Sequence, residues 1–303
     1  YLRRDLSIYD FFAFWEIWRI CRKYKFDIVH THSSKTGFLG RIAARLAGVK
    51  KIIHTSHGFP FNKFQSLPTR LFYMCCETFA AFFCDRVVFV NQHDRDYAIQ
   101  KKIVNARKAV TIYNGIEIFQ KNPARPKSNR FIIGSSFRFW QQKNPIQTVK
   151  AAIQVCLQNP QIDFKFLGDG ELLKNCIQLV EEAEMSERII FAGWVTSVYD
   201  YLAEFDAFLL YSKWEGLPVS ILEAMSFGLP IIASDIAGNR ELVDETNGML
   251  VSLNEVDKLI DLLITLPSRK DELVKLGKES RKRVEEKFSI TEFIRKYKEI
   301  YET

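Results

Sequence analysis

Two glutamates stand eight positions apart in the stretch WEGLPVSILEAMSFGLP, which covers residues 214–230. Glu215 lies in a turn after an apolar run, and Glu223 lies inside a predicted helix that starts near Leu217 or Pro218 and ends at Gly228. A carboxylate among apolar neighbours is costly unless it has a partner. Because carboxylates accept hydrogen bonds from hydroxyl groups, the pair favours a sugar-like ligand. Acids also occur near helix starts without any ligand, so Glu223 is the more informative of the two.

A helix start and two cations accompany these glutamates. The predicted helix begins after the carboxyl end of a strand, where its unpaired N–H groups and the positive end of its dipole suit a diphosphate. Arg138 and Lys143 lie five residues apart in the loop SFRFWQQKNP, which follows another predicted strand. Two cations at the same sheet edge could neutralise a diphosphate as it leaves. The alternative is that both residues only solubilise their loop.

Short apolar strands alternate with helices along the chain, which is the pattern of parallel sheets covered by helices. The polar segment 120–130, with two prolines, predicts a linker between two such halves. We therefore expect two doubly wound α/β domains whose carboxyl strand edges face a common cleft, where such folds bind ligands. The predicted strands are 27–32, 51–56, 86–90, 109–113, 131–136, 163–168, 188–193, 207–212 and 230–234. The predicted helices are 36–48, 71–83 and 93–102, those starting at Pro145 and Glu171, the one described above, and those that fill the last 50 residues.

The composition fits an ordinary soluble globular protein of two domains. The chain has 303 residues, of which 47% are apolar and 26% are charged. No apolar run reaches the roughly 18 residues that a membrane span requires, and the start has no secretory h-region. The six cysteines lie mostly in apolar helical contexts without metal-ligand spacing, so we expect reduced thiols and a cytoplasmic protein.

Basic charge is concentrated in the first part of the chain. Residues 1–118 contain 19 Lys and Arg against 9 Asp and Glu, about +10, whereas the rest contains 24 against 27, and the whole chain carries +7. A basic surface suits an anionic partner such as a phosphate-bearing substrate or an acidic membrane. The alternative is a solvated basic face without a partner.

Aromatic residues gather in the loop that follows the second predicted strand. Phe59, Phe61 and Phe64 lie there, with Lys63 and Arg70 beside them. Exposed aromatic and basic side chains suit docking onto an anionic bilayer and holding a lipid-linked diphosphate. We therefore expect peripheral membrane attachment through this loop. The alternative is that the phenylalanines fold back into the core.

The chain resembles the retaining glycosyltransferases of family 4, which have the GT-B fold, and within them the bacterial branch that builds capsule, exopolysaccharide and lipid-linked glycans. The resemblance covers nearly the whole length, and its specificity comes from the joint order of motifs that are weak singly. It implies transfer of a hexosyl or N-acetylhexosaminyl group from a nucleotide diphosphate-sugar, with a UDP-sugar favoured, to a glycan or polyprenyl-diphosphate-linked acceptor. Besides the spacing of Arg138 and Lys143, the motifs are DIVHTHSSKTGFLGRIAARLAG, IIHTSHGFPF, IYNGIE, FLGDGEL, FAGWV and EGLPVSILEAMSFGLPIIASDIAGNRELV.

The resemblance also implies a role for each matching residue. Glu215 binds hydroxyls of the donor sugar, Arg138 and Lys143 hold the leaving diphosphate, and His57 lies near the donor sugar. Glu223 binds the ribose of the nucleotide. The remaining donor-binding positions are Gly168, Trp194, Val195, Gly216, Leu217, Val219 and Ser220.

Domain limits follow from the same resemblance. Residues 1–120 form an acceptor-side Rossmann-like domain, 121–285 a nucleotide-sugar-binding Rossmann-like domain, and 286–303 a C-terminal helix that packs back toward the first. The family pattern has another strand and a glycine-rich loop before residue 1, so we expect the first domain to lack its first elements. The family's usual GRL is FRF here, at 137–139, although the spacing from Arg138 to Lys143 is kept.

No metal and no cofactor are expected, since the nucleotide-sugar is a substrate. The triplet Asp94–Asp96 resembles the metal-binding DxD of the other glycosyltransferase fold, but it follows a strand at a predicted helix start, where acids favour the helix dipole. The histidines and cysteines show no closed zinc spacing. His57 could alternatively be a strand-end histidine bonded to backbone, and His30, His32 and His54 are interpreted as structural.

The expected setting is peripheral, on the cytoplasmic face of a bacterial membrane, with a lipid-linked or glycan acceptor and no nucleic acid. A soluble small acceptor is the alternative. A nucleotide-dependent oxidoreductase is disfavoured because no G-x-G-x-x-G follows a predicted strand. A catalytically silent scaffold is disfavoured because both glutamates and both cations are present. No acid stands out as a nucleophile, so a front-face mechanism is expected, in which the leaving diphosphate helps to deprotonate the acceptor hydroxyl.

Overall fold

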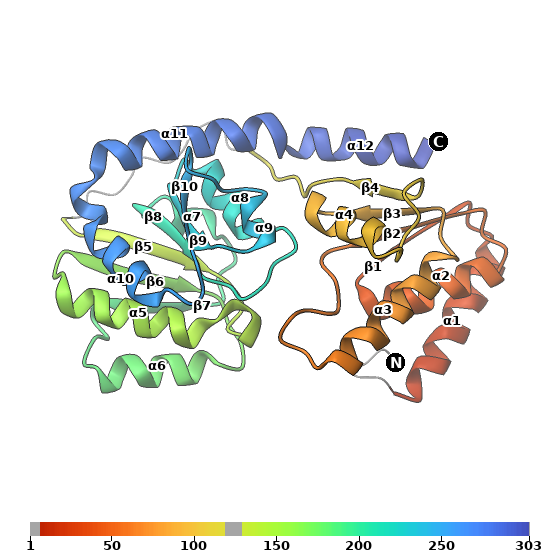
Figure 1. Cartoon of the computed structure of the whole chain (residues 1–303), viewed down its shortest axis with the longest axis horizontal. Coiled ribbons are helices and arrows are strands. Elements are labelled where there is room, and N and C mark those ends of the chain that lie inside the picture. Colours follow the sequence, from red (N-terminus) through yellow and green to blue (C-terminus); the bar gives the residue numbers. More distant parts are fainter. Residues whose placement is uncertain (1–6, 119–128, 303) are drawn as a thin grey trace. The chain divides into compact units, whose positions relative to one another are not determined.

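The computed structural model describes residues 7–118 and 129–302, and the chain divides into two compact units (Figure 1). Unit 1 comprises residues 1–114 and 293–303, and unit 2 comprises residues 115–292. Each unit contains a parallel sheet with helices packed on it, so the predicted α/β class is confirmed. Most of the predicted linker, 120–130, lies outside the described residues.

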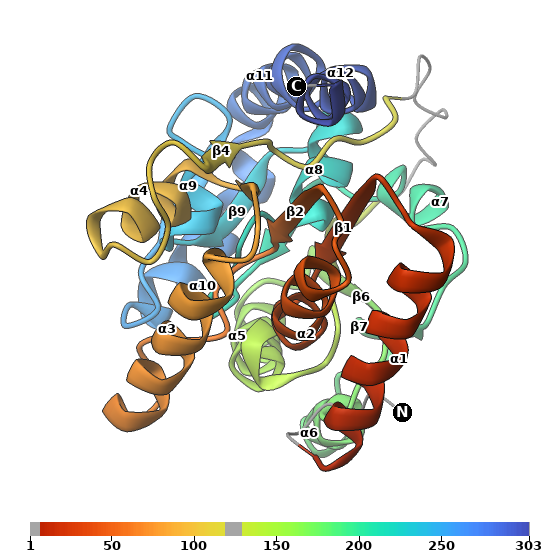
Figure 2. The same ribbon diagram turned by 90° about the vertical axis from the view of Figure 1, so that its right-hand side faces the viewer.

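Unit 1 is built on a four-stranded parallel sheet in the order β1-β2-β3-β4. Helices α1, α2 and α3 lie as neighbours on one side of this sheet, and α12 lies on the other (Figure 2). The strands are β1 (Ile28–His32), β2 (Lys51–Ser56), β3 (Arg86–Phe89) and β4 (Ala109–Thr111). The helices are α1 (Tyr9–Tyr24), α2 (Ser34–Leu46), α3 (Leu67–Ala81), α4 (Gln92–Gln100) and the part of α12 (Ile290–Glu302) from Phe293 onward.

The aromatic loop after β2 is part of the core of unit 1. Phe61 is 7% exposed, and its ring lies 4.6 Å from that of Phe59, which also contacts Phe89 and Tyr97. Burying a phenylalanine stabilises a fold by about 1.5–3 kcal/mol, which favours this inward packing. Only Phe64, at 52% exposed, projects outward. The prediction of an exposed aromatic loop is therefore wrong for Phe59 and Phe61.

The acidic triplet Asp94–Asp96 lies near the start of α4, whose N-cap is Asn91. The Asn91 side chain accepts a hydrogen bond from the Asp94 backbone N–H (2.6 Å) and donates one to the Asp94 carboxylate (3.0 Å). Asp96 accepts hydrogen bonds from Gln92 and Arg95 instead. The first bond satisfies a helix-end N–H, and the second holds the capping side chain in place, which agrees with the capping interpretation.

Unit 2 is built on a six-stranded parallel sheet in the order β10-β9-β8-β5-β6-β7. The order reverses between β5 and β8, and ligands of such sheets bind where the order reverses, beyond the carboxyl ends of the strands. The strands are β5 (Phe131–Ser136), β6 (Ile162–Leu167), β7 (Ile189–Gly193), β8 (Ala207–Leu210), β9 (Ile231–Ser234) and β10 (Gly248–Val251). The helices are α5 (Pro145–Gln158), α6 (Leu173–Glu182), α7 (Tyr199–Leu202), α8 (Val219–Ser226), α9 (Ala237–Arg240), α10 (Val256–Thr265) and α11 (Lys270–Lys287), with short 3-10 turns at Gln141–Lys143 and Leu266–Ser268.

Helix α8, which carries Glu223, is fixed by α11. A Cβ on Gly277 of α11 would lie 2.1 Å from the carbonyl oxygen of Gly228, so only glycine permits this close approach. Arg281 of α11 donates a hydrogen bond to the carbonyl of Ser226 at the end of α8. Packing and hydrogen bonding therefore hold the helix that positions Glu223.

The last helix joins unit 1 through its side chains. The Tyr297 hydroxyl lies 2.8 Å from Thr55 Oγ1 at the end of β2, and the Tyr301 hydroxyl lies 2.7 Å from His30 Nδ1 on β1. Tyr297 and Ile300 also pack with Ile53 in a buried cluster on this face of the sheet. Among the described residues, no helix combines the length and apolar character that a membrane span needs.

Candidate functional site

A pocket of about 350 Å³ lies at the carboxyl ends of β5, β6 and β7 in unit 2. It collects side chains from loops that are far apart in sequence, beside the point where the strand order reverses. Five residues that the sequence predicted line it: Arg138, Gly168, Trp194, Val195 and Glu223. Lining residues that the sequence did not single out are Ser136, Phe137, Leu167, Asp169, Thr196, Val198 and Tyr199.

Arg138 reaches this pocket because its two neighbours turn the other way. Phe137 and Phe139 are buried, with ring centroids 5.0 Å apart, and Phe139 also packs edge-on against Phe191. In extended backbone successive side chains alternate between faces, so two inward phenylalanines force the arginine between them outward. The FRF sequence therefore gives Arg138 a rigid aromatic base. Its guanidinium is exposed and lies 5.0 Å from the ring centroid of Trp140.

Gly168 lets the loop after β6 lie directly against the Arg138 loop. Its φ is +123°, and a Cβ there would stand 2.0 Å from the carbonyl oxygen of Phe137. The backbone N–H of Phe139 donates to the carbonyl of Asp169 (2.9 Å), which ties the two loops together. Gly168 thus shapes the pocket wall through its backbone.

Gly168→Ala is expected to lower the free energy of unfolding by about 3–4 kcal/mol, because a strained φ and a backbone clash add. Gly193→Ala is the matched control, since Gly193 also has a positive φ (+68°) but a Cβ there meets nothing within 4 Å. It should cost only about 1–2 kcal/mol. Urea unfolding of both variants measures the difference, and equal losses would contradict the close packing of the two loops.

Glu223 presents a carboxylate to the pocket from an otherwise apolar helix. Its neighbours Leu222 and Ala224 are fully buried. Burial raises the pKa of Glu223 to about 7. Within the described residues, its carboxylate makes no hydrogen bond or ion pair. A half-buried acid with unused acceptor capacity fits a ligand that brings hydroxyl donors.

Tyr199 lies on the same pocket wall and escaped the sequence reasoning. Burial and the neighbouring Glu223 carboxylate raise the pKa of its phenol, with a smaller effect from Glu117. Its ring stacks on Phe227, at 5.9 Å between centroids and an interplanar angle of 12°. Tyr199 is the first residue of α7, a helix of only four residues. So short a helix has no hydrophobic periodicity from which the sequence could predict it.

Lys143 and Glu215 form an ion pair beside β5 and β8 and do not line the pocket. Lys143 Nζ lies 2.5 Å from Glu215 Oε1, and the two side chains are 18% and 6% exposed. Gln142 donates to the carbonyl of Trp214 (2.9 Å), which joins the same two loops. A Cβ added to Gly238 of α9 would lie 2.5 Å from the carbonyl oxygen of Glu215. The backbone of α9 therefore packs closely against this turn. The sequence assigned the two charged residues separate ligand contacts, whereas here they bind each other.

The start of α8 holds the remaining predicted positions of unit 2. The helix begins at Val219, one or two residues later than the predicted start at Leu217 or Pro218, because Pro218 is extended and acts as the N-cap. Gly216 and Leu217 are buried, whereas Val219 is exposed. The amides of Val219 and Ser220 belong to the first turn, which has no intrahelical acceptors for them.

The rim of the pocket carries Trp194 directly after β7. Its side chain is 76% exposed, an unusual setting for the largest aromatic residue. Val195, the next residue, lines the pocket as well. An exposed indole at a pocket rim offers a flat surface on which a planar ring can stack.

His57 lies in unit 1, just beyond the carboxyl end of β2. Its Nε2 is 3.0 Å from Nδ1 of His32, the last residue of β1. Burial lowers the pKa of His57, and the neighbouring His32 adds to this effect. The alternative of a histidine bonded to backbone is therefore wrong, and its partner is a second histidine that the sequence treated as structural. His54 is structural, because it is buried and hydrogen-bonded to Thr31 (3.0 Å).

No cluster of three or more acid, histidine or cysteine ligands that could hold a metal ion occurs in the part of the chain that the structure describes. All six cysteines are free thiols. Burial raises the pKa of Cys156 to about 11 and that of Cys176 to about 12, so these thiols are protonated near neutral pH.

Known proteins share this architecture. The structure of HepE from Anabaena with UDP and glucose superposes with a TM-score of 0.83, at 18% identity, over 99% of this chain and 84% of that one. Sucrose-phosphate synthase from Thermosynechococcus elongatus superposes with a TM-score of 0.84, at 19% identity, over 100% and 80%. At such identities the likeness establishes the fold alone, which is the GT-B fold of glycosyltransferases.

Sequence comparisons go further. The model of the glycosyl transferases group 1 matches residues 116–283, and that of glycosyltransferase family 4 matches residues 1–118. The UDP-Gal:alpha-D-GlcNAc-diphosphoundecaprenol alpha-1,3-galactosyltransferase of Escherichia coli is 36% identical over 99% of this chain and 81% of that protein. The putative glycosyltransferase EpsD of Bacillus subtilis (strain 168) is 26% identical over 92% and 76%. The chain therefore belongs to the family 4 glycosyltransferases.

Proposed function

We propose that the chain transfers a hexosyl or N-acetylhexosaminyl group, with retained anomeric configuration, from a UDP-sugar to a polyprenyl-diphosphate-linked saccharide. The observation that carries the proposal is the Glu223 carboxylate, which opens to the unit 2 pocket without a partner among the described residues and has Arg138 on the same lining. The name of the Escherichia coli relative, which acts on UDP-Gal and a diphosphoundecaprenol-linked sugar, supports both substrates. A soluble acceptor is the alternative.

The nucleoside is assigned to the pocket itself. Glu223 accepts hydrogen bonds from the two ribose hydroxyls, which replace the solvent that burial removed. Uracil stacks at the rim formed by Trp194 and Val195, and Gly168 allows the loops to close around it. Tyr199, whose ring stacks on Phe227, fixes the wall beside Glu223.

The diphosphate is assigned to the edge between β5 and β8. Arg138 and Lys143 neutralise its charge, and the first amides of α8, at Val219 and Ser220, donate to its oxygens. Glu215 binds hydroxyls of the donor sugar while it holds Lys143 in place. The ion pair supports this assignment because it pre-orients a cation that would otherwise be a flexible side chain.

The transfer itself breaks the bond between the anomeric carbon and the β-phosphate oxygen, and the diphosphate keeps the electron pair. The acceptor hydroxyl attacks the anomeric carbon from the same face, and its proton passes to the departing phosphate oxygen. The products are UDP and the extended glycoside, with atoms and charge balanced. The chain's residues act by orienting the reactants and stabilising the leaving group. His57 hydrogen-bonds a hydroxyl of a sugar substrate.

Calorimetry and a transfer assay test the proposal together. UDP should bind, with GDP and ADP weaker and NAD absent, and labelled sugar should pass from a UDP-sugar to a polyprenyl-diphosphate-linked acceptor. Turnover should persist in EDTA, because none of the assigned roles requires a metal. Binding of UDP without any transfer across a panel of UDP-sugars and acceptors would leave a silent scaffold, and failure to bind UDP would remove the proposal.

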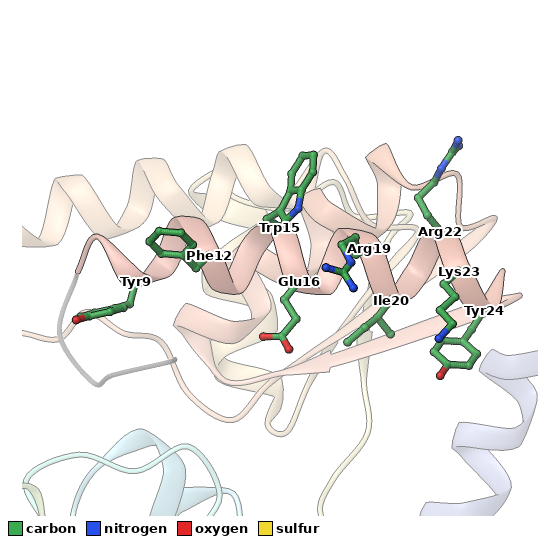
Figure 3. Close-up of a pocket in the computed structure, with 9 residues that line it drawn as sticks. All are labelled: Tyr9, Phe12, Trp15, Glu16, Arg19, Ile20, Arg22, Lys23 and Tyr24. Atoms are coloured by element: carbon green, nitrogen blue, oxygen red, sulfur yellow. The ribbon is translucent and has the colours of Figure 1, made fainter.

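Attachment to an anionic bilayer is part of the proposal, and we assign it to α1 in place of the β2 loop, whose Phe59 and Phe61 pack inward. Helix α1 packs on α2, and its buried residues are Ala13 and Cys21. Side chains on the rest of the helix, among them Phe12, Trp15 and Lys23, line a pocket (Figure 3). Aromatic and apolar side chains lie toward its start and basic ones toward its end, a composition that suits the headgroup boundary. The exposed residues at and just before α1 are Ile8, Tyr9, Phe11, Phe12, Trp15, Glu16, Arg19, Ile20, Arg22, Lys23 and Tyr24, and Glu16 is the one acid among them.

Phe12→Ser together with Trp15→Ser is expected to weaken binding to anionic vesicles by more than about tenfold, since each aromatic contributes about 1.5–3 kcal/mol when buried. High salt should weaken it further, because each basic residue near the surface is worth about 1 kcal/mol. Leu157→Ser, on α5 of unit 2 and 57% exposed, is the matched control and should bind like wild type. Co-sedimentation with anionic and neutral vesicles measures this, and equal binding by all three proteins would contradict docking through α1.

A further inference from the structure

Three histidines of unit 1 form a contiguous cluster at the carboxyl edge of its sheet. His30 and His32, two residues apart on β1, have ring centroids 4.3 Å apart. His32 Nδ1 then lies 3.0 Å from His57 Nε2. The His32 and His57 rings are inclined by only 24°, with centroids 5.3 Å apart, so the nitrogens face each other almost in the ring planes. This is the geometry of an N–H···N hydrogen bond.

The cluster is anchored on one side by α12. His30 uses both ring nitrogens, with Nδ1 2.7 Å from the Tyr301 hydroxyl and Nε2 2.8 Å from Thr55 Oγ1. Thr55 in turn lies 2.8 Å from the Tyr297 hydroxyl. Both ring nitrogens of His30 and the Thr55 hydroxyl therefore have hydrogen-bond partners. These bonds fix the His30 ring, and the His32 ring packs against it.

The backbone also holds His32 in place. In the register of β1 and β2, His32 is opposite Thr55, so His57 follows two residues beyond the end of the paired segment. Ser33, directly after His32, has φ +63° and ψ 156°, an unfavourable conformation for a residue other than glycine. The Thr36 hydroxyl donates to the His32 carbonyl at 2.5 Å. Strained backbone that the surroundings hold in place is common at functional sites.

The chemistry of the pair limits what it can offer a ligand. One N–H···N bond joins two neutral imidazoles only if one nitrogen carries the proton and the other does not. Burial lowers the pKa of both histidines, so both are neutral near pH 7. His57 Nδ1 and His32 Nε2 make no hydrogen bond within the described residues, and one of them must be a donor and the other an acceptor. A sugar hydroxyl can serve either.

We infer that His32 is a positioning residue, which fixes the ring orientation and tautomer of His57 so that its Nδ1 meets a hydroxyl of the sugar substrate. The inference rests on the proposed function, which assigns His57 to a sugar hydroxyl. A pocket of about 480 Å³, lined by His30, His32 and residues of α12 including Lys298, lies on the His30 side of the cluster, and His57 does not line it. Through His30, the last helix of the chain thereby contributes to substrate positioning.

Two substitutions separate positioning from mere packing. His32→Ala removes the bond to His57 and should lower kcat/KM for transfer by about 10–100-fold, the scale of a misplaced contact group. His32→Asn places an amide where Nδ1 was, keeps the bond, and should stay within about threefold of wild type. His93→Ala, on the outer side of α4, changes the fifth histidine and should have no effect. Melting temperatures of all three check the fold.

Side-chain ¹⁵N NMR of labelled histidines provides a readout that does not depend on transfer. In wild type, His57 should show one dominant tautomer, and in His32→Ala a mixture. Affinity for UDP, which concerns unit 2, should be unchanged throughout. A tautomer mixture in wild type, or wild-type kcat/KM in a folded His32→Ala protein, would overturn the inference. If wild type transfers no sugar at all, the proposed function fails, while the NMR signals still decide whether His32 orients His57.

Discussion

Replacing Lys143 by alanine is expected to lower kcat by about 10²–10³-fold at saturating donor, the range for losing one preorganised group that stabilises transition-state charge. Lys143 is held 2.5 Å from Glu215 in a nearly buried pair, so its cation is aimed before the substrate arrives. Negative charge grows on the diphosphate as the glycosidic bond breaks, and a fixed cation stabilises that state more than the ground state. Arg138→Ala should act in the same direction.

Stability has to be separated from chemistry in this experiment. Removing Lys143 leaves the Glu215 carboxylate buried without its partner, which should cost about 2–4 kcal/mol of unfolding free energy. Adding Glu215→Gln to Lys143→Ala should restore most of that stability and none of the turnover. Lys165→Ala is the matched control. Lys165, on β6 of the same sheet, forms a comparable ion pair with Glu204, at 2.5 Å between Nζ and Oε2. If Lys143→Ala keeps near-native kcat, or loses no more than Lys165→Ala, the leaving-group assignment is wrong.

Glu223→Gln is expected to raise the free energy of unfolding and to weaken the binding of UDP. Burial holds the pKa of Glu223 at about 7, above its usual 4.5, so the folded state retains a proton that the unfolded chain has already released. The ionised carboxylate therefore destabilises the fold fully above pH 7 and not at all below pH 4.5. At pH 8 the variant should gain about 1–3 kcal/mol in unfolding free energy. This total is somewhat smaller than the full pKa difference would give at about 1.36 kcal/mol for each pKa unit. The gain should vanish near pH 4.5.

Binding should change in the opposite direction. Loss of a charged acceptor for the ribose hydroxyls costs about 1–3 kcal/mol, or roughly 5–150-fold in Kd for UDP. In wild type the affinity should fall as the pH drops through 7, because protonation removes the same acceptor, and in Glu223→Gln it should be flat. Glu181→Gln, on the exposed side of α6, should change neither property. Calorimetry and urea unfolding at pH 8 and pH 4.5 measure both, and a variant that binds UDP like wild type would exclude the ribose role.

Much of the fold was predictable because its signals are local. Every predicted strand is present within two residues, since short apolar runs between polar turns mark buried parallel strands. Strand β10 (Gly248–Val251) was missed, although other strands of the same length were predicted. The pocket was predictable to the extent that its residues follow strands: Arg138 follows β5, Gly168 follows β6 and Trp194 follows β7.

Contacts between distant segments were not predictable from one sequence. The Lys143–Glu215 pair depends on β5 and β8 being neighbours, although two strands separate them in the chain. The His32–His57 bond depends on the register of β1 against β2. The inward packing of Phe61 depends on the space beside Tyr97, which no period in the loop encodes. In each case the residue type was recognised and its partner was not.

The anomeric configuration of the product tests the central claim most directly. Wild-type protein would be incubated with an α-linked UDP-hexose or UDP-N-acetylhexosamine and a polyprenyl-diphosphate-linked saccharide, and the purified product would be examined by proton NMR at its new anomeric position. Retaining transfer predicts an α-linked sugar in the product, with UDP released in equal amount and no requirement for metal. A β-linked product, or release of UDP with the sugar found only as free hydrolysate, would contradict the account.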